Sequence, residues 1–303
     1  EELSNFLGQE KTLLLSTGYQ ANLGVIKSLV SRGDNIISDK LNHASLIDGS
    51  ITSRANFKRY NHNDCEHLEE ILVNTKRKNN LVVSDSLFSM DGDIPNLKKI
   101  NTIVKKYDSL LLIDEAHSIG VFEKDGRGLI YKNSLNDKEN IFITGTFGKA
   151  VGTFGAFFSG KKDHVEFVLQ KARSYIYSTS LPVNAVEATR KSLKIISKEN
   201  WRREKLISLI SYYKKNIKES GFKSLKSNSQ IQAILIGSSK DALYVSDQLF
   251  KSGIYIPAIR PPTVEEGKSR LRISLTVDHQ LSDIDYLINI LQKISRNLVQ
   301  SQE

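Results

Sequence analysis

The stretch of sequence that decides the fold is residues 110–117, Leu-Leu-Leu-Ile-Asp-Glu-Ala-His. Four consecutive apolar residues are followed at once by a carboxylate. A continuous apolar run, in contrast to an alternating one, is typical of a strand buried on both faces of a mostly parallel sheet. Asp114 then lies at the carboxyl end of that strand, which is where ligands bind in open α/β sheets.

Comparable apolar runs, separated by helix-like stretches, recur through the first two-thirds of the chain. We expect further strands at residues 12–16, 35–38, 57–60, 81–84, 141–144 and 154–159. We expect helices at residues 20–30, 44–54, 66–72, 97–106 and 163–174. This alternation predicts an α/β fold with a mostly parallel central sheet flanked by helices.

The pattern of apolar and charged residues changes after Pro182. A long amphipathic stretch, residues 183–220, precedes expected strands at 232–236, 255–259 and 271–275 and expected helices at 242–251 and 283–297. These elements predict a small α+β domain with its boundary near Glu199. We therefore expect a large domain at residues 1–198 and a small C-terminal domain at residues 199–303.

Composition narrows the classes of function. Of the 303 residues, 39% are hydrophobic and 25% are charged, as in ordinary globular proteins. The formal net charge of +9 favours a Lys-rich solvated surface, with attraction of an anionic substrate as the alternative. No basic arm with interleaved aromatic residues is present, so we expect no nucleic-acid partner.

The cellular setting is also indicated by the sequence. The single cysteine, Cys65, permits no disulfide within the chain and fits a reducing, cytoplasmic compartment. No apolar run approaches the roughly 20 residues that a membrane span needs, so we expect no membrane contact. The chain begins with Glu1, and we expect that an N-terminal segment is missing.

Two other interpretations of residues 114–117 are not supported by the neighbouring sequence. The letters D-E-A-H are a helicase signature, but the phosphate-binding loop of an NTPase is missing, because Ala150 follows Gly148-Lys149 where Ser or Thr should hold the metal. A metal site using Asp114 and His117 lacks further ligands nearby, so we expect no metal.

A pyridoxal phosphate (PLP) site accounts for three features together. PLP needs a carboxylate beside its pyridine nitrogen, and Asp114 supplies one at a strand end. It needs a lysine for an imine, and Lys149 follows an apolar strand. It needs a phosphate cup, and Gly18-Tyr19 opens a helix whose free N–H groups suit an anion. Each signal is weak alone, but their order along the chain is specific.

Beyond these features, the chain resembles the α-oxoamine synthases, which are PLP enzymes of the aspartate-aminotransferase-like fold, or fold type I. The resemblance covers essentially the whole sequence. The runs that carry it are residues 16–22 (STGYQAN), 41–45 (LNHAS), 88–93 (FSMDGD), 114–120 (DEAHSIG), 126–128 (GRG), 146–149 (TFGK) and 177–180 (YSTS). It implies a PLP-dependent acyltransferase with Lys149, Asp114 and His43 as catalytic residues.

The resemblance also implies roles for residues around the cofactor. His43 would stack on the ring and contact substrate, His117 would hydrogen-bond the ring oxygen, Ser89 would contact the cofactor and Thr146 would bind its phosphate. From the residues alone, His43 is also compatible with an ordinary helix-start residue, and Ser89 with an ordinary turn residue. The cofactor contacts that we expect are Gly18, Tyr19, His43, Ser89, Asp114, His117, Thr146, Lys149, Ser178 and Thr179.

The segment containing Ser178 and Thr179 is the basis for the quaternary structure that we expect. In the family it resembles, this segment reaches the phosphate of the neighbouring subunit's cofactor, which implies a homodimer. Its hydroxyl groups are suitable phosphate donors. From the residues alone, residues 177–182 are also compatible with a polar loop that ends at a proline.

Two further runs indicate the substrates. Residues 258–264 (AIRPPTV) and 270–276 (RLRISLT) look like the branch of the family that joins L-alanine to a pimeloyl thioester. That branch makes 8-amino-7-oxononanoate for biotin synthesis, with coenzyme A or acyl carrier protein as the acyl carrier. Thr263 would contact the substrate, and Arg272 would bind the amino-acid carboxylate, although a strand arginine is often only a surface charge. The alternative is a paralogue such as glycine C-acetyltransferase or 5-aminolevulinate synthase.

Overall fold

The computed structural model describes residues 1–75, 79–135 and 139–300. The chain divides into two compact units. The first comprises Glu1–Phe88 and Ile94–Asn200, and the second comprises Ser89–Asp93 and the chain from Trp201 onward. The end of the expected small domain, residues 301–303, lies outside the described residues.

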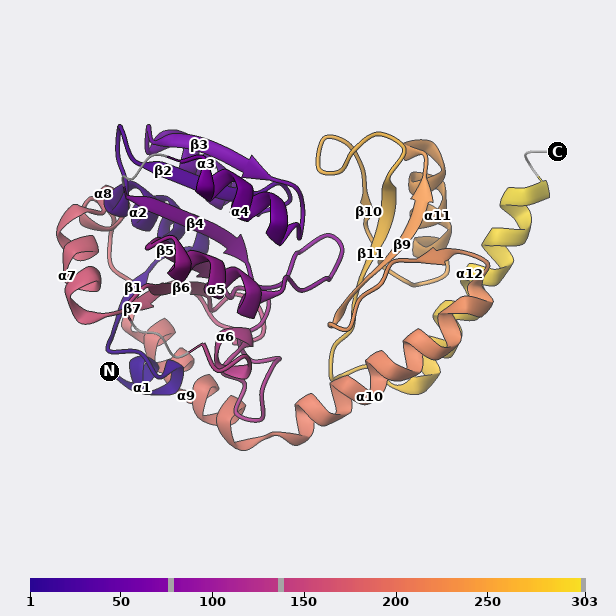
Figure 1. Ribbon diagram of the computed structural model, residues 1–303. Coiled ribbons are helices and arrows are strands. Elements are labelled where there is room, and N and C mark those ends of the chain that lie inside the picture. Colours follow the sequence, from indigo (N-terminus) through magenta and orange to yellow (C-terminus); the bar gives the residue numbers. More distant parts are fainter. Residues whose placement is uncertain (76–78, 136–138, 301–303) are drawn as a thin grey trace. The chain divides into compact units, whose positions relative to one another are not determined.

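The first unit is built on a seven-stranded sheet with the order β1-β7-β6-β5-β4-β2-β3 (Figure 1). The strands are β1 (Lys11–Leu15), β2 (Asn35–Asp39), β3 (Asn56–Tyr60), β4 (Asn80–Asp85), β5 (Leu110–Asp114), β6 (Ile141–Thr146) and β7 (Ala156–Gly160). The five strands from β2 to β6 pair in parallel, and β7 pairs antiparallel with both β6 and β1. The predicted mostly parallel sheet is confirmed.

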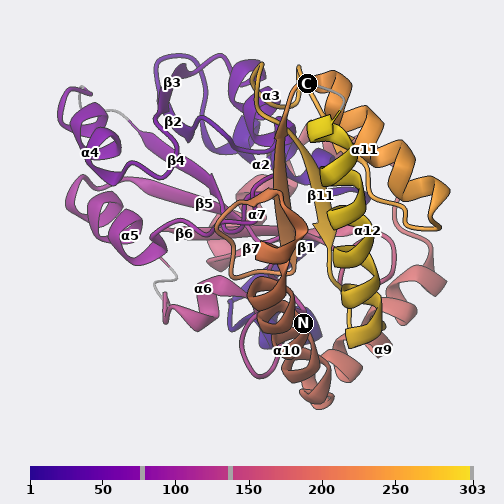
Figure 2. The same cartoon turned by 90° about the vertical axis from the view of Figure 1, so that its right-hand side faces the viewer.

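Helices cover both faces of this sheet. They are α1 (Glu2–Leu7), α2 (Gly18–Leu29), α3 (Ala44–Thr52), α4 (Cys65–Val73), α5 (Leu97–Lys106), α6 (Leu129–Lys132), α7 (Lys162–Lys171), α8 (Arg173–Ile176) and α9 (Val183–Lys198). Figure 2 shows α4 and α5 on one side of the sheet and α2 and α3 on the other. The direction of strand addition reverses after β3, and right-handed crossovers therefore place α3 and α4 on opposite faces.

The core of the first unit lies between the sheet and α2. Ile36, Val83, Leu112 and Phe142 come from four neighbouring strands and are fully buried with Val25 of α2. Such strands are buried on both faces, which explains their continuous apolar sequences. The packing fixes the height of each strand, and with it the position of the residue at each carboxyl end.

The second unit has a four-stranded antiparallel sheet with the order β10-β11-β9-β8. Its strands are β8 (Lys223–Ser224), β9 (Ile231–Gly237), β10 (Ala258–Ile259) and β11 (Ser269–Ser274), and its helices are α10 (Trp201–Asn216), η1 (Ile217–Ser220), α11 (Ser239–Lys251) and α12 (Leu281–Gln300). Leu209, Ile234, Leu249, Leu271 and Leu291 form the centre of its core. Within the described residues, no helix has the length and apolarity to cross a bilayer.

A short segment from the middle of the chain, Ser89–Asp93, belongs to this second unit. The carbonyl oxygen of Gly92 accepts hydrogen bonds from the hydroxyls of Ser227 (2.7 Å) and Ser229 (2.9 Å), and Asp91 pairs with Arg270. Gly92 has a φ of 73°, and a Cβ there would lie 2.1 Å from the carbonyl oxygen of Ile231. Only glycine fits this close backbone approach. The sequence did not predict this contact.

Three expected elements differ from the structure. The stretch 183–220 is not one helix, because α9 ends at Lys198 and α10 begins at Trp201. The helix expected at 163–174 is interrupted at Ala172, whose ψ of 99° is extended. The strand expected at 255–259 contains only Ala258–Ile259, because Pro257 has no N–H to donate to a neighbouring strand.

Candidate active site

One cavity of the first unit, about 210 Å³ in volume, lies where the carboxyl ends of β4, β5 and β6 meet. Its lining residues are Gly18, Tyr19, His43, Ser45, Asp85, Asp114, Ala116, His117, Thr146 and Lys149. The neighbouring parallel strands supply Asp85, Asp114 and Thr146, each as the last residue of its strand. The sheet topology thus gathers residues that are far apart in the sequence.

Asp114 is held in one orientation by two donors. Its Oδ1 accepts a hydrogen bond from the backbone N–H of Ala116 (2.9 Å), and its Oδ2 accepts one from Nδ2 of Asn22 (2.7 Å). The residue is buried. A carboxylate has about four lone-pair sites, so both oxygens can accept a further proton donor from the cavity.

Asp85 is a second acid in the cavity that the sequence analysis missed. It ends β4 directly opposite Asp114 of β5, and its Oδ2 accepts a hydrogen bond from the backbone N–H of His43 (2.7 Å). Burial raises the pKa of the Asp85 carboxyl well above its ordinary value, and the negative charge of Asp114 raises it further. Burial and the nearby negative charge therefore favour the protonated form of Asp85.

Lys149 and His117 meet at one wall of the cavity. Nζ of Lys149 lies 2.9 Å from Nε2 of His117. Lys149 follows β6 in a tight turn, in which the N–H of Gly152 donates to the Lys149 carbonyl (2.9 Å) and the N–H of Phe147 donates to the Gly155 carbonyl (2.8 Å). The side chain of Phe147 is buried beneath this turn. The turn anchors the lysine backbone and leaves its amine accessible.

The buried carboxyl of Glu115 fixes the turn after β5 in which His117 lies. Glu115 accepts hydrogen bonds from the hydroxyl of Ser118 (2.7 Å) and from the backbone N–H groups of Leu129 (2.9 Å) and Ile130 (2.7 Å). Burial raises the pKa of Glu115 to about 7. These contacts hold the turn after β5 against the start of α6.

His43 is the N-cap of α3. Its Nδ1 lies 2.7 Å from the hydroxyl of Ser45 and 3.3 Å from the backbone N–H of the same residue. Partial burial lowers the pKa of the His43 ring; the negative charge of Asp114 opposes this effect, and the positive charge of Lys149 adds to it. The ring is therefore a neutral imidazole at neutral pH.

The third wall is suited to an anion. Helix α2 begins at Gly18, and its N-cap Thr17 accepts a hydrogen bond from the N–H of Gln20 (3.2 Å). The hydroxyl of Thr146 accepts one from the N–H of Gly148 (3.3 Å). Helix α2 has 12 residues, and the backbone N–H groups of its first turn and the positive end of its dipole would favour an anion here.

The donor set of the cavity fits PLP. A fixed carboxylate suits a protonated ring nitrogen, the Lys149 amine suits the aldehyde carbon, and the start of α2 suits a phosphate. The Thr146 hydroxyl lines the same cavity and here donates to the Gly155 carbonyl (3.1 Å). All three groups line one cavity. His43 and His117 supply the remaining polar edges.

The structure brings seven of the predicted site residues together: Gly18, Tyr19, His43, Asp114, His117, Thr146 and Lys149. Ser178 and Thr179 are in the first unit but do not line this cavity. Nε2 of Gln20 donates to the Ser178 hydroxyl (3.4 Å), and the Ser16 hydroxyl donates to the Thr179 carbonyl (3.3 Å). This segment therefore lies beside the start of α2.

Three predicted residues, Ser89, Thr263 and Arg272, belong to the second unit. Within that unit, Nε of Arg272 donates to the Ser89 carbonyl, and its Nη1 donates to the hydroxyl of Ser274 (2.9 Å). The guanidinium is thus oriented by two contacts. The predicted contacts of these three residues with cofactor and substrate stay predictions.

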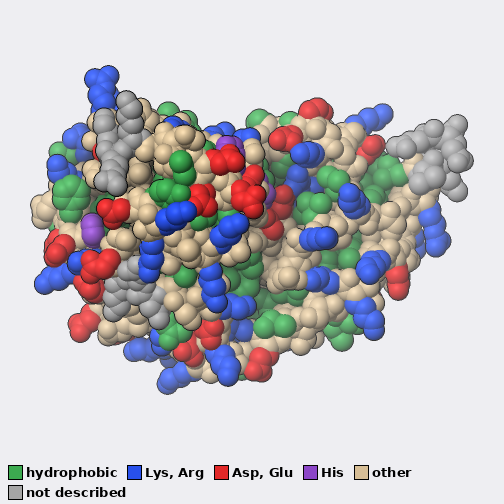
Figure 3. Space-filling view, in the orientation of Figure 1, with side chains coloured by type: hydrophobic (Ala, Val, Ile, Leu, Met, Phe, Trp, Pro, Cys, Tyr) green, Lys and Arg blue, Asp and Glu red, His purple; other side chains and the backbone are tan. Residues whose placement is uncertain are grey.

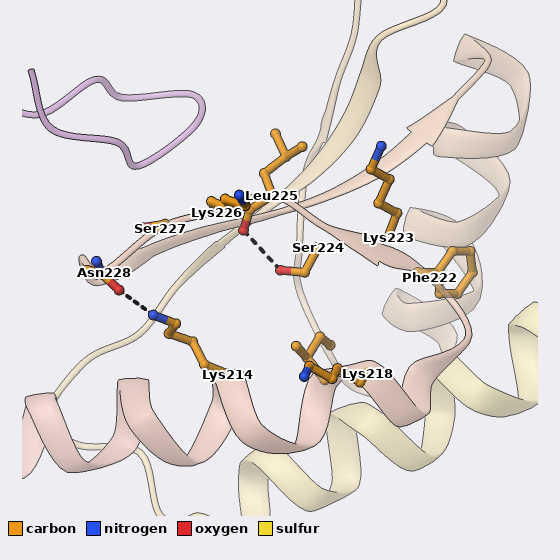
Figure 4. Close-up of a pocket in the computed structure, with 10 residues that line it drawn as sticks. Lys214, Lys218, Phe222, Lys223, Ser224, Leu225, Lys226, Ser227 and Asn228 are labelled. Carbon is orange, nitrogen blue, oxygen red and sulfur yellow. Dashed lines mark hydrogen bonds between the residues drawn. The ribbon is translucent and has the colours of Figure 1, made fainter.

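A larger cavity of about 570 Å³ lies in the second unit, between α10 and β8 (Figure 4). Its cations are Lys214, Lys218, Lys223 and Lys226, and none of the predicted site residues lines it among those the structure describes. Lys214 donates to the Asn228 side chain, and Figure 4 shows Lys223 pointing away from the helix that carries Lys214. Figure 3 shows Lys and Arg side chains spread over the surface in view, with acidic ones among them, so basic side chains are not confined to this cavity.

Comparisons with known proteins show the family of the chain. Residues 1–291 match the family described as aminotransferase class I and II. The chain is 44% identical to an 8-amino-7-oxononanoate synthase of Saccharophagus degradans over 298 residues, which are 98% of this chain and 75% of that protein. It is 42% identical to the corresponding synthase of Nitrosococcus oceani, covering 97% of this chain and 78% of that protein.

Two solved structures are similar over nearly the whole chain. A serine palmitoyltransferase variant from S. paucimobilis with bound PLP and myriocin superposes with a TM-score of 0.92 at 32% identity, covering 97% of this chain and 75% of that one. An 8-amino-7-oxononanoate synthase from Francisella tularensis superposes with a TM-score of 0.85 at 30% identity, covering 98% and 86%. The predicted fold type I is thereby confirmed.

Proposed function

Since the chain belongs to the aminotransferase class I and II family, we propose that it is a PLP-dependent acyltransferase of the 8-amino-7-oxononanoate synthase type. The reaction is the decarboxylative condensation of L-alanine with a pimeloyl thioester, which gives 8-amino-7-oxononanoate, CO₂ and the free thiol. The observation that carries the proposal is the meeting of Asp114, His117 and Lys149 around one cavity, in a chain 44% identical to such a synthase.

PLP, when bound, is an electron sink for the negative charge that develops on the substrate α-carbon. Asp114 holds a proton on the ring nitrogen, because its buried carboxylate is fixed by Asn22 and Ala116 and accepts a further N–H donor. Burial raises the pKa of the Asp85 carboxyl beside it, which limits the negative charge at this position. The start of α2 and the hydroxyl of Thr146 bind the phosphate.

Lys149 is the proton carrier. Its Nζ removes the proton from the substrate α-carbon as a general base and returns one after CO₂ is lost. His117, 2.9 Å away, holds the amine at the cavity wall and hydrogen-bonds the ring oxygen. His43 packs against the cofactor ring and excludes water from that side. The Lys149 amine thus moves the proton, whereas the two imidazoles bind and position.

Substrate recognition involves the second unit. Arg272, already oriented by Ser89 and Ser274, binds the carboxylate of alanine through its remaining N–H groups, and Thr263 contacts the substrate. The acyl carrier is coenzyme A or acyl carrier protein, both anionic partners that suit a net charge of +9. The alternative function is that of a paralogue using glycine, such as glycine C-acetyltransferase or 5-aminolevulinate synthase.

The proposal includes the assembly and its setting. The enzyme is a cytoplasmic homodimer, and Ser178 and Thr179 contact the phosphate held by the partner subunit. In its own chain their segment lies beside the start of α2, and its assignment to the partner's phosphate rests on the resemblance of residues 177–180 to the family. The large PLP-binding domain is residues 1–198 and the small domain is residues 199–303.

A substrate panel tests the function. Protein with its natural N-terminus is given alanine, glycine or serine with pimeloyl, acetyl or succinyl thioesters, and release of the free thiol is measured. We expect alanine with a pimeloyl thioester to be preferred, and Lys149→Ala to be inactive with every pair. A clear preference for glycine with acetyl- or succinyl-coenzyme A would contradict the assignment within the family, although the PLP assignment would stand.

A further inference from the structure

A single buried amide connects two of the proposed catalytic residues. Asn22 lies on α2 and is almost completely buried, at 1% exposure. Its Nδ2 is 2.7 Å from Oδ2 of Asp114 and 2.9 Å from the hydroxyl of Ser45, and its Oδ1 is 2.7 Å from the hydroxyl of Thr144. The amide thus uses both of its donors and its acceptor within the protein.

The direction of each hydrogen bond follows from these partners. A carboxylate accepts and cannot donate, so the NH₂ group of Asn22 faces Asp114, and its second hydrogen is directed to Ser45. The oxygen of the amide then accepts from Thr144. A flipped amide would place its oxygen against the carboxylate, which would replace an attraction by a repulsion.

The Ser45 hydroxyl links Asn22 to His43 and determines which nitrogen of the ring accepts a hydrogen bond. It accepts from Asn22, so its single hydrogen is free to point elsewhere, and Nδ1 of His43 lies 2.7 Å away. The backbone N–H of Ser45 is directed to the same nitrogen at 3.3 Å. Nδ1 therefore accepts, and in the neutral ring the proton lies on the other nitrogen, Nε2.

We propose that Asn22 and Ser45 are positioning residues that hold His43 in the Nε2–H tautomer and couple it to the Asp114 carboxylate. This inference rests on the proposed function for its consequence. With its proton on Nε2, His43 donates a hydrogen bond to a substrate oxygen and cannot remove a proton there. Lys149 is then the base of the reaction, and His43 is a donor that also packs on the ring.

The test reads the tautomer directly. In the holoenzyme labelled with ¹⁵N-histidine, two-bond proton–nitrogen spectra distinguish a protonated Nδ1 from a protonated Nε2, and the His43→Gln spectrum identifies the His43 signals. We expect the wild type to show the proton on Nε2. We expect Ser45→Ala to shift His43 toward a mixture of tautomers, and Ser45→Thr, which keeps the hydroxyl, to restore the wild-type pattern.

Ser50→Ala is a matched control. Ser50 is a buried serine of the same helix, and its hydroxyl donates only to the carbonyl of Leu46 among the described contacts (2.6 Å), so the same change leaves His43 untouched. Losing one hydrogen bond of about 0.5–1.5 kcal/mol corresponds to a decrease of roughly 2- to 10-fold in kcat for Ser45→Ala. We expect a small change in KM for alanine, and no change of either constant in Ser50→Ala.

A double-mutant cycle tests the coupling. If Asn22 acts on His43 through Ser45, the Asn22→Ala/Ser45→Ala double variant should have the same His43 tautomer ratio as Ser45→Ala. A wild-type proton on Nδ1, or a tautomer unaffected by Ser45→Ala, would overturn the inference. These spectra need no turnover, so a failure of the proposed substrates would leave this result interpretable.

Discussion

Replacing Asp114 by asparagine is the most informative single change, because it keeps the shape of the side chain and removes its charge. Both carboxylate oxygens accept hydrogen bonds, Oδ1 from Ala116 at 2.9 Å and Oδ2 from Asn22 at 2.7 Å. In Asp114→Asn, the new NH₂ group must face one of these two N–H donors. One buried hydrogen bond therefore becomes a contact between two donors.

The structural part of the cost follows from this contact. Leaving a buried donor unsatisfied costs about 1–3 kcal/mol, and we expect the free energy of unfolding of the apoprotein to fall by that amount. The catalytic part is separate. An amide does not hold a proton on the ring nitrogen, and losing a buried electrostatic contact of this kind costs at least about 3 kcal/mol of transition-state stabilisation, or 10²-fold in kcat.

Three measurements separate the two parts. Denaturant unfolding of the apoprotein gives stability, visible absorbance gives bound PLP, and thiol release gives turnover. Asp247→Asn is the control, since Asp247 is an exposed acid of α11 paired with Lys251 at 2.7 Å, and we expect it to behave as wild type. An Asp114→Asn enzyme that retains PLP and turns over at near wild-type rates would refute the role given to the carboxylate.

Three further predictions follow from the same site. Borohydride treatment of the yellow holoenzyme should attach the cofactor to Lys149 alone, and peptide mapping that finds another lysine would contradict the assignment. Burial raises the pKa of Glu115 from 4.5 to about 7, so its contribution to the free energy of unfolding is largest below about pH 4.5 and falls by about 3 kcal/mol as the pH rises to 7. Glu115→Gln should reduce the slope of the stability–pH curve between these pH values, and an unchanged slope would refute this assignment of the titration to Glu115. Mixing Lys149→Ala chains with a Ser178→Ala/Thr179→Ala double variant should restore one intact site per heterodimer; a protein that sediments as a monomer with full activity and bound PLP would exclude the shared site.

The sequence was sufficient to predict the residues that end strands. An apolar run followed by a polar residue locates a strand end, and parallel strand ends share one edge of a sheet. Asp114 was found in this way, whereas Thr146 was predicted only from the resemblance to the family. Asp85 follows the same rule, at the end of the run Leu81-Val82-Val83-Ser84, and was overlooked only because the expected strand was closed one residue too early.

Contacts that depend on the order of the strands could not be predicted. Ser89–Asp93 joins the second unit because Ser227 and Ser229 bind the carbonyl of Gly92, over a sequence separation of at least 135 residues. Neither serine stands out in a polar loop. The break at Ala172 is equally hidden, because alanine favours a helix and only tertiary packing overrides that preference.

Asn22 illustrates the same limit within the site. On its own helix it is a polar residue in an interior position, where asparagine has no helix-forming advantage. The role of Asn22 becomes apparent only in the folded chain, where α2 packs over the carboxyl ends of β5 and β6. This packing brings Asn22 to Asp114, 92 positions away, and to Thr144, 122 positions away. A buried amide costs free energy unless its donors and acceptor are all paired, and here they are. The hydrogen bonds that hold Asp114 and His43 in place therefore depend on how α2 packs on the folded sheet, whereas the two residues themselves could be identified from the sequence.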